Sequence, residues 1–281
     1  MSADVFLCSD LDRTILPNGP QQESPQARRR LQALAAHPRV VLTYVSGRHK
    51  ALLLDAIREY MIPIPDYAIG DVGTTIYEVS GNNWHAWPAW GETIASDWQG
   101  MEWHGLAALL KNVDQLALQE PEKQNTFKLS YYVPETIDCD ALQKRIVERL
   151  GAYGLRVSVI WSIDEVNHVG LLDILPANAT KLHAVRFLME KKGFAEMRTV
   201  FAGDSGNDLP VLTSGLQAVL VRNARDEVRQ EAVTRIKATG KRECLYLAHG
   251  GFLGMNGNYA AGVLEGLAHF LPETAQWMSQ C

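Results

Sequence analysis

Short apolar runs and helical segments alternate along the first third of the chain. Apolar runs at 5–9, 40–45 and 66–69 predict buried strands. Ser24–Pro25 predicts a helix N-cap followed by proline at the first helical position, opening a helix through Ala36, and a second helix is expected to end near Tyr60. Strands that alternate with helices at this spacing are typical of a parallel sheet with crossover helices.

The pattern changes near residue 84. Five of the seven tryptophans fall between Trp84 and Trp103, and a polar stretch follows them. Large aromatic side chains suit the core of a small domain, so we interpret this cluster as packing rather than as a platform for a sugar ring. The elements expected next are strands at 128–133, 156–161 and 169–175, with a helix at about 139–150.

The parallel pattern then resumes. A helix is expected at about 180–192, strands at 199–202 and 218–221, and a last helix at 258–270. We therefore predict an α/β fold: a doubly wound parallel-sheet (Rossmann-like) core with an inserted smaller α+β cap domain. The predicted core consists of residues 1–83 and 169–281, and the predicted cap of residues 84–168.

Composition and charge limit the kinds of molecule that this chain is expected to bind. A formal net charge of −5 and a pI near 5.9 argue against a protein that holds nucleic acid through phosphate contacts, but leave room for a small anionic substrate. No stretch has the length of a membrane span or the form of a signal peptide, and the four cysteines form no CxxC pair. We expect a cytoplasmic protein with no membrane partner, either a monomer or a weak dimer.

Polar residues follow three of the predicted strands, where parallel sheets place their ligands. Asp10, Asp12 and Thr14 follow the first strand, Ser46 and Arg48 the second, and Asp204 and Asp208 a later one, while Lys181 opens a helix. Four carboxylates brought together would repel one another unless a hard cation lay among them, and oxygen ligands suit Mg²⁺. Lys181, the Ser46 hydroxyl and glycine-rich backbone at Gly47 could hold a phosphate beside it.

These motifs resemble those of the haloacid dehalogenase superfamily of phosphatases. Asp10–Leu11–Asp12–Arg13–Thr14 is similar to its DxDxT signature, and Ser46–Gly47–Arg48, Lys181 and the GDSGND run at 203–208 follow in the same order. The long insert between the second and third motifs resembles the branch with an α/β cap at that place. The resemblance covers nearly the whole chain.

The resemblance implies a role for each residue. Asp10 would be the nucleophile that forms an aspartyl-phosphate, and Asp12 would be the general acid and base. The implied Mg²⁺ set is Asp10, Asp12 (through its carbonyl), Asp204 and Asp208, the last as ligand or orienter. The implied phosphate-binding set is Thr14, Ser46, Gly47, Arg48, Lys181 and Asn207.

Two further stretches resemble sucrose-phosphate phosphatases and related disaccharide-phosphate phosphatases. They are NTFKLSYY at 125–132, which makes Lys128 a candidate contact to the sugar, and AAGVLEGLAHF at 260–270. Thr180 and Leu182 depart from the asparagine and glycine that usually flank the third-motif lysine. The implied substrate is therefore a sugar phosphate, with sucrose 6-phosphate first, and mannosylfructose-phosphate or another disaccharide phosphate open.

Two other functions remain. The chain could be a non-catalytic module that binds a sugar phosphate or associates with a sugar-phosphate synthase, although such domains should have lost their carboxylates. It could also be a phosphomutase, which shares most of these motifs and moves phosphate instead of releasing it.

Overall fold

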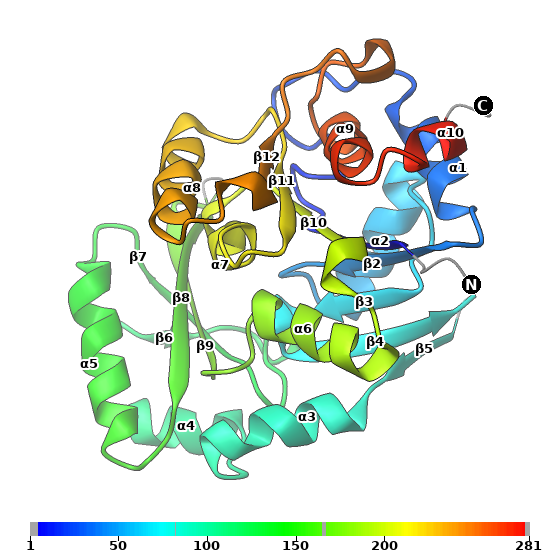
Figure 1. Ribbon diagram of the computed structural model, residues 1–281. Helices are drawn as coiled ribbons and strands as arrows, with labels where there is room; N and C mark the ends of the chain where they lie inside the picture. Colours follow the sequence, from blue (N-terminus) through cyan, green and yellow to red (C-terminus); the bar gives the residue numbers. More distant parts are fainter. Residues whose placement is uncertain (1–4, 82, 165–166, 279–281) are drawn as a thin grey trace.

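The computed structural model describes residues 5–81, 83–164 and 167–278 (Figure 1). Within these residues, eight strands form the core sheet in the order β12-β11-β10-β1-β2-β3-β4-β5. The pairs from β12 to β3 are parallel, and β4 and β5 form an antiparallel hairpin at one edge. The strands are β1 (Val5–Ser9), β2 (Val40–Val45), β3 (Tyr67–Gly70), β4 (Thr75–Ser80), β5 (Asn83–Ala86), β10 (Thr199–Gly203), β11 (Gln217–Leu220) and β12 (Leu245–Leu247).

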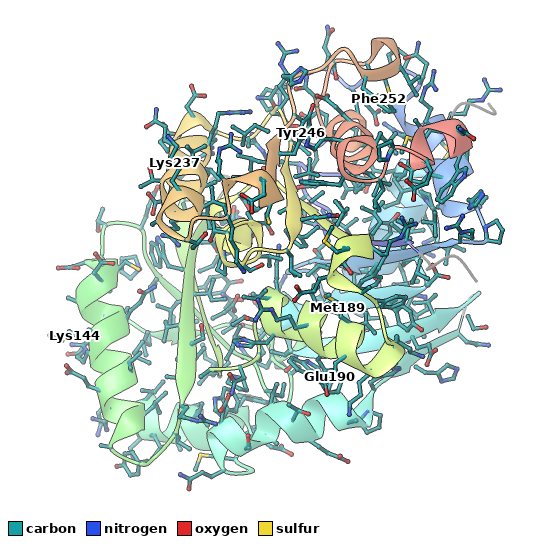
Figure 2. The ribbon with its side chains drawn as sticks, in the orientation of Figure 1. Lys144, Met189, Glu190, Lys237, Tyr246 and Phe252 are labelled. Carbon is teal, nitrogen blue, oxygen red and sulfur yellow. The ribbon has the colours of Figure 1, made fainter. Side chains whose placement is uncertain are left out.

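Helices cover both faces of this sheet, as the doubly wound prediction requires. The buried side chains of α1 (Ala27–Ala35), α2 (Lys50–Tyr60) and α9 (Ala260–Phe270) pack on one face. Those of α3 (Pro88–Ala95), α6 (Lys181–Lys192), α7 (Leu209–Leu212) and α8 (Asp226–Ala238) pack on the other. The short α10 (Thr274–Trp277) lies beside α1 and α9. In α6, Met189 is buried and Glu190 is exposed, which is the amphipathic pattern expected of a covering helix (Figure 2).

A second sheet forms the cap. Its strands are antiparallel in the order β6-β7-β9-β8, with β6 at Ala117–Leu118, β7 at Leu129–Pro134, β8 at Val157–Asp164 and β9 at Val169–Pro176. Helices α4 (Trp103–Leu110) and α5 (Cys139–Gly151) pack on one face of this sheet around a separate apolar cluster. The α/β core with an inserted cap is confirmed (Figure 1).

The expected boundaries at 83 and 168 need correction. The strand expected at 169–175 fell in the predicted core, but the observed strand β9 pairs with β7 and β8 in the cap sheet. At the other boundary, β5 still pairs with β4, and Trp90 of α3 packs in the core cluster. The cap sheet therefore extends to about residue 176. The sequence did not reveal this, because a nearly continuous apolar run suits a buried strand of either sheet.

The start of α1 also differs from the prediction. The helix begins at Ala27 after Gln26, and no side chain caps it. The Ser24 hydroxyl instead accepts a hydrogen bond at 2.8 Å from the backbone N–H of Asn256. The Ser24 hydroxyl, which the sequence predicted to cap the helix, thus binds a residue more than 200 positions away in the sequence.

Among the helices of the described residues, none combines the length and the apolar character that crossing a bilayer requires.

Candidate active site

Asp10 lies where the winding of the core sheet reverses. It directly follows β1, which is flanked by β2 on one side and β10 on the other. Its backbone N–H donates to the carbonyl of Ala202 in β10 at 2.9 Å, and its side chain is buried. Ligands of doubly wound sheets bind outside the carboxyl ends of the strands at such a switch point.

Lys181 joins the carboxylates of two motifs. Its ammonium donates to Asp10 Oδ1 and Asp208 Oδ1, both at 2.7 Å, and to Asn207 Oδ1 at 3.2 Å. The side chains of Lys181, Asp10 and Asp208 are all buried. Burial alone would lower the pKa of Lys181, but Asp10 and Asp208 raise it above its usual value, so the ammonium stays charged.

Thr180 explains why Lys181 stands at this place. Its side chain accepts from the backbone N–H of His183 and caps α6, so Lys181 is the first helical residue. Threonine is a good N-cap residue. The departure noted in the sequence therefore preserves the start of the helix.

The acidic cluster is electrostatically strained without a cation. Burial raises the pKa of Asp10 well above its usual value, Asp208 and Asp204 add to this, and Lys181 opposes it. Burial, with the nearby charge of Asp208, raises the pKa of Asp204 to about 7 against the opposing charges of Arg13 and Lys181. Each of the two carboxylates resists ionisation, which a bound cation would relieve.

The same cluster has the donor set of a metal site. One oxygen each of Asp10, Asp204 and Asp208 lies within 4.8 Å of the others. Asp208 Oδ2 accepts from the backbone N–H groups of Asp204 and Ser205 at 3.1 and 3.2 Å, and its Oδ1 accepts from Lys181. Oxygen-only donors of this kind fit a hard divalent ion, and the hydrogen bonds of Asp208 suit an orienting role.

Asp12 is held apart from this cluster. Arg48 binds its carboxylate with two nitrogens at 2.9 and 2.6 Å, and the Asn18 amide donates to it at 2.7 Å. Burial would raise the pKa of Asp12, yet the hydrogen bonds and charge of Arg48, with Asn18, hold it below its usual value. Asp12 is therefore ionised here, and Arg48 is paired with it.

The remaining predicted residues lie at the same edge of the sheet. The Thr14 hydroxyl is within hydrogen-bond distance of Asp10 at 3.2 Å and Asp204 at 3.4 Å, so it orients those carboxylates. Ser46 Oγ accepts from the backbone N–H of Arg48 at 3.1 Å. Asn207 Oδ1 accepts a hydrogen bond from the Lys181 ammonium. Each of these residues was predicted to contact phosphate.

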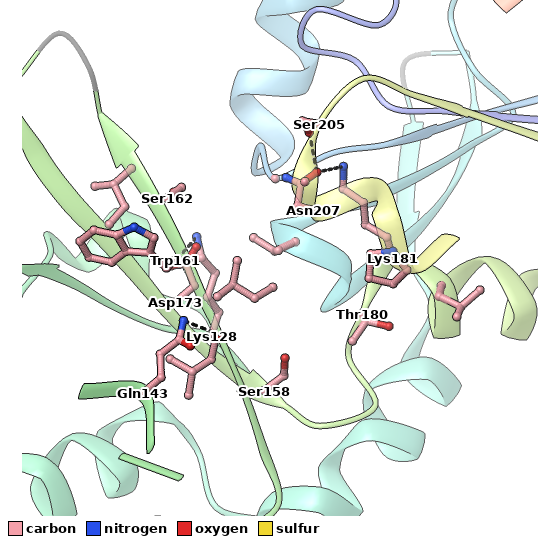
Figure 3. Close-up of a pocket in the computed structure, with 18 of the residues that line it drawn as sticks. Lys128, Gln143, Ser158, Trp161, Ser162, Asp173, Thr180, Lys181, Ser205 and Asn207 are labelled. Carbon is pink, nitrogen blue, oxygen red and sulfur yellow. Dashed lines mark hydrogen bonds and ion pairs between the residues drawn. The ribbon is translucent and has the colours of Figure 1, made fainter. Parts of the chain in front are cut away.

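A cavity of about 910 Å³ lies between this edge of the core and the cap (Figure 3). Its core side includes Gly47, Thr180, Lys181, Ser205 and Asn207, and the Lys181 ammonium donates to Asp10. Its cap side carries the polar side chains Ser158, Ser162, Asp173 and Lys128 beside apolar ones such as Ile160 and Leu171. A site of this size and polarity suits a ligand with many hydroxyl groups.

Lys128 projects into the cavity just before β7 begins. Its ammonium lies 4.0 Å from Asp173 Oδ1, and its side chain is 9% exposed. A separation of 4.0 Å is too long for a hydrogen bond, so this contact leaves the donors of the Lys128 ammonium for a ligand. Lys128 and Lys181 thus stand on opposite walls of one cavity (Figure 3).

The profile of the sucrose-6F-phosphate phosphohydrolase family matches residues 3–271. The chain belongs to this family. A HAD-like hydrolase of Nitrosococcus oceani is 61% identical over 99% of this chain and 75% of its own length. Mannosylfructose-phosphate phosphatase of Agrobacterium fabrum is 27% identical over 94% of this chain and 96% of its own length.

Among solved structures, the chain is similar to the sucrose-phosphatase of Synechocystis sp. PCC6803 in complex with sucrose and phosphate. The two share 25% identity and a TM-score of 0.74 over 95% of this chain and 98% of that one. Family membership and these relatives make the chain a haloacid dehalogenase-type phosphoric monoester hydrolase of the sugar phosphatase kind.

Several residues of the site were not predicted. Arg13 Nε lies 3.3 Å from Asp204 Oδ2, and its backbone has φ 59°. Arg13 occupies the second variable position of the DxDxT motif. Its positive charge between Asp12 and Thr14 was the one feature of the sequence that could have marked it as a site residue. Asp173 and Asn125 join the cap side through long-range contacts, for which the sequence carries no local signal.

Proposed function

We propose that the chain hydrolyses a disaccharide phosphate, sucrose 6-phosphate first and mannosylfructose-phosphate as the alternative, through an aspartyl-phosphate at Asp10 and with Mg²⁺. The observation that carries this proposal is the buried Asp10–Lys181–Asp208 cluster, whose Lys181 lines a cavity that has polar side chains on its opposite wall. The kinship to a sucrose-phosphatase and a mannosylfructose-phosphate phosphatase supports both named substrates.

In the first half-reaction, an Asp10 carboxylate oxygen attacks phosphorus. The bond between phosphorus and the sugar oxygen breaks, and the leaving oxygen takes a proton from Asp12. Lys181 and the Ser46 hydroxyl hold the phosphoryl oxygens, whose charge spreads as the group transfers. Arg48 and Asn18 hold Asp12 as a carboxylate, so Asp12 has to leave these partners and take up a proton from water before it can protonate the leaving oxygen.

In the second half-reaction, water replaces the sugar. Asp12, ionised after giving up its proton, takes a proton from this water, and the water oxygen attacks phosphorus. The acyl phosphate bond breaks, which releases inorganic phosphate and restores the Asp10 carboxylate. The proton count closes over the two steps.

The Asp10 and Asp204 carboxylates, with the backbone carbonyl of Asp12, would hold the magnesium ion, and Asp208 would orient them. The ion would supply positive charge that offsets repulsion between the Asp10 carboxylate and the incoming phosphate. The raised pKa values of Asp10 and Asp204 support this assignment, since both carboxylates gain from a neighbouring cation.

Magnesium is expected to stabilise the fold as well as the reaction. At a concentration near 100 times its Kd, it should raise the melting temperature by about 5 °C. The gain should be larger at pH 8 than at pH 5, because the pKa of Asp204 is raised to about 7 and a proton competes with the ion below that value. Differential scanning calorimetry with and without EDTA measures both effects.

Asp204→Asn gives the control for this prediction. The variant should be somewhat more stable than the parent without metal, because a buried carboxylate is removed, and should gain little from Mg²⁺. A parent melting temperature that ignores Mg²⁺ at pH 8 would contradict the assigned ion site.

Replacing Lys128 by alanine is expected to weaken sugar binding. KM for the disaccharide phosphate should rise about tenfold, since a charged donor within the cavity is lost, and kcat should change little. Lys123→Ala, at another lining lysine that is exposed, is the matched control. Steady-state phosphate release measures both constants, and an unchanged KM would remove Lys128 from the site.

The substrate is tested by phosphate release across a panel with Mg²⁺. The panel contains sucrose 6-phosphate, mannosylfructose-phosphate, trehalose 6-phosphate, glucose 6-phosphate and fructose 6-phosphate. The proposal expects one disaccharide phosphate to have the highest kcat/KM by at least about tenfold. Moved rather than released phosphate would support the mutase reading, and no turnover of any sugar phosphate would support the binding module. Association with a synthase stays a prediction.

A further inference from the structure

The loop that follows β3 meets both the phosphate-binding edge of the core and the cap. Its residues Asp71, Val72 and Gly73 all have positive φ, at 52°, 61° and 103°. This conformation is uncommon for a β-branched residue such as valine, and neighbouring structure must hold it in place. Strained backbone of this kind is a reason to look for a function.

Backbone contacts tie the loop to two of the catalytic motifs. The N–H of Asp71 donates to the carbonyl of Arg48 at 3.0 Å, and the N–H of Val72 donates to that of Ser46 at 3.2 Å. At Gly73, a Cβ atom would lie 2.8 Å from the carbonyl carbon of Thr180 and 3.0 Å from the nitrogen of Lys181. The loop is therefore fixed against the residues that flank the phosphate-binding side chains.

Side chains tie the same loop to the cap. The Asn125 amide donates to the Thr74 hydroxyl at 2.9 Å. Burial raises the pKa of the Asp71 carboxylate, while the charge of Lys128 and the side chain of Asn125 oppose this rise. Asp71 and Thr74 are buried, so these contacts are shielded from water. We call this group of three side chains, Asp71, Thr74 and Asn125, the latch.

Asn125 of the latch is also hydrogen-bonded to Lys128 through the backbone. Asn125 and Lys128 exchange backbone hydrogen bonds at 3.2 and 3.1 Å, and Asn125 Oδ1 accepts from the N–H of Phe127 at 2.9 Å. The 125–128 segment is thus a tight turn whose first residue is held by the core and whose last residue projects into the cavity. Fixing Asn125 fixes where the Lys128 ammonium can reach.

We propose that Asp71 and Thr74 are positioning residues for sugar recognition: through Asn125 they hold the turn that places Lys128 opposite the phosphate-binding wall of the cavity. This inference rests on the proposed function. The latch thereby fixes the separation between Lys181 on the core wall and Lys128 on the cap wall. A substrate whose phosphate binds Lys181 and whose sugar binds Lys128 must have a length that matches this separation.

Asp71→Asn and Thr74→Val test the proposal in the full-length chain. For the better of sucrose 6-phosphate and mannosylfructose-phosphate, each variant should raise KM about tenfold and change kcat less than about twofold. Hydrolysis of p-nitrophenyl phosphate should stay at the parent rate, because this small substrate needs only the core. Thr75→Val is the matched control: it removes a hydroxyl 3.4 Å from Asp71 Oδ2 and leaves Asn125 untouched, so KM should not change.

The exchange Asp71→Asn with Asn125→Asp restores an amide–carboxylate pair in the reverse order. It should bring KM back to within about threefold of the parent value, which a loop that is merely damaged would not do. An unchanged KM in the single variants, or an equal loss on both kinds of substrate, overturns the latch alone. A parent chain that hydrolyses p-nitrophenyl phosphate but neither disaccharide phosphate overturns the proposed substrate, and with it the role of the latch.

Discussion

Asp10→Asn is expected to lower kcat by about 10⁴-fold or more, because it replaces the carboxylate that attacks phosphorus in the proposed mechanism. The fold should persist. Burial and the neighbouring carboxylates raise the pKa of Asp10, so a neutral amide suits its surroundings without metal, and the amide oxygen still accepts from Lys181. Circular dichroism and phosphate release on the same preparation measure fold and activity.

Asp55→Asn is the control for this variant. Asp55 lies on the exposed side of α2 and pairs with Arg58 of the same helix, so its substitution should leave kcat unchanged. Turnover near the parent rate in Asp10→Asn would mean that another group attacks phosphorus.

Lys181→Met should affect both stability and activity. It leaves Asp10 and Asp208 buried without their shared cation, which should cost about 3–5 kcal/mol of unfolding free energy at pH 8. The cost should be smaller at pH 5, where the carboxylates take up protons more readily, since the pKa of Asp10 is already raised. Turnover should fall by about 10²–10³-fold, as when one donor to a transition state is removed.

The same substitution at Lys144 is the control. Lys144 lies on the outer face of α5 and makes an exposed pair with Glu148 at 3.9 Å (Figure 2). Such pairs contribute little, so stability should change by less than about 0.5 kcal/mol. Urea unfolding compares the two variants, and equal losses would show that the buried triad of charges does not set the stability of the core.

The features that sequence predicted best are those set by local pattern. Apolar runs followed by aspartates located the carboxyl ends of β1 and β10, and parallel pairing then brings Asp10 and Asp204 to one edge. The tryptophan cluster was assigned to packing, and Trp90 and Trp98 are among the most buried side chains. Each of these predictions needs only short segments and the geometry of a sheet.

What the sequence missed depends on contacts between distant segments. Ser24 satisfies Asn256 instead of a helix terminus, and β9 joins the cap sheet because its partners β7 and β8 lie there. The hydrogen bond from Asn125 to Thr74 likewise joins the cap to the core. Local propensity holds no information on such pairings, so both domain boundaries and the cap side of the cavity needed the structure.

The central claim is that phosphate passes through a covalent bond to Asp10. The most direct measurement is to quench the chain during turnover of the preferred disaccharide phosphate, reduce any acyl phosphate with borohydride, and find the resulting homoserine by peptide mass spectrometry. The account predicts homoserine at position 10 and unmodified Asp12, Asp204 and Asp208. Rapid phosphate release with no modification at Asp10, or modification at another carboxylate, would contradict it.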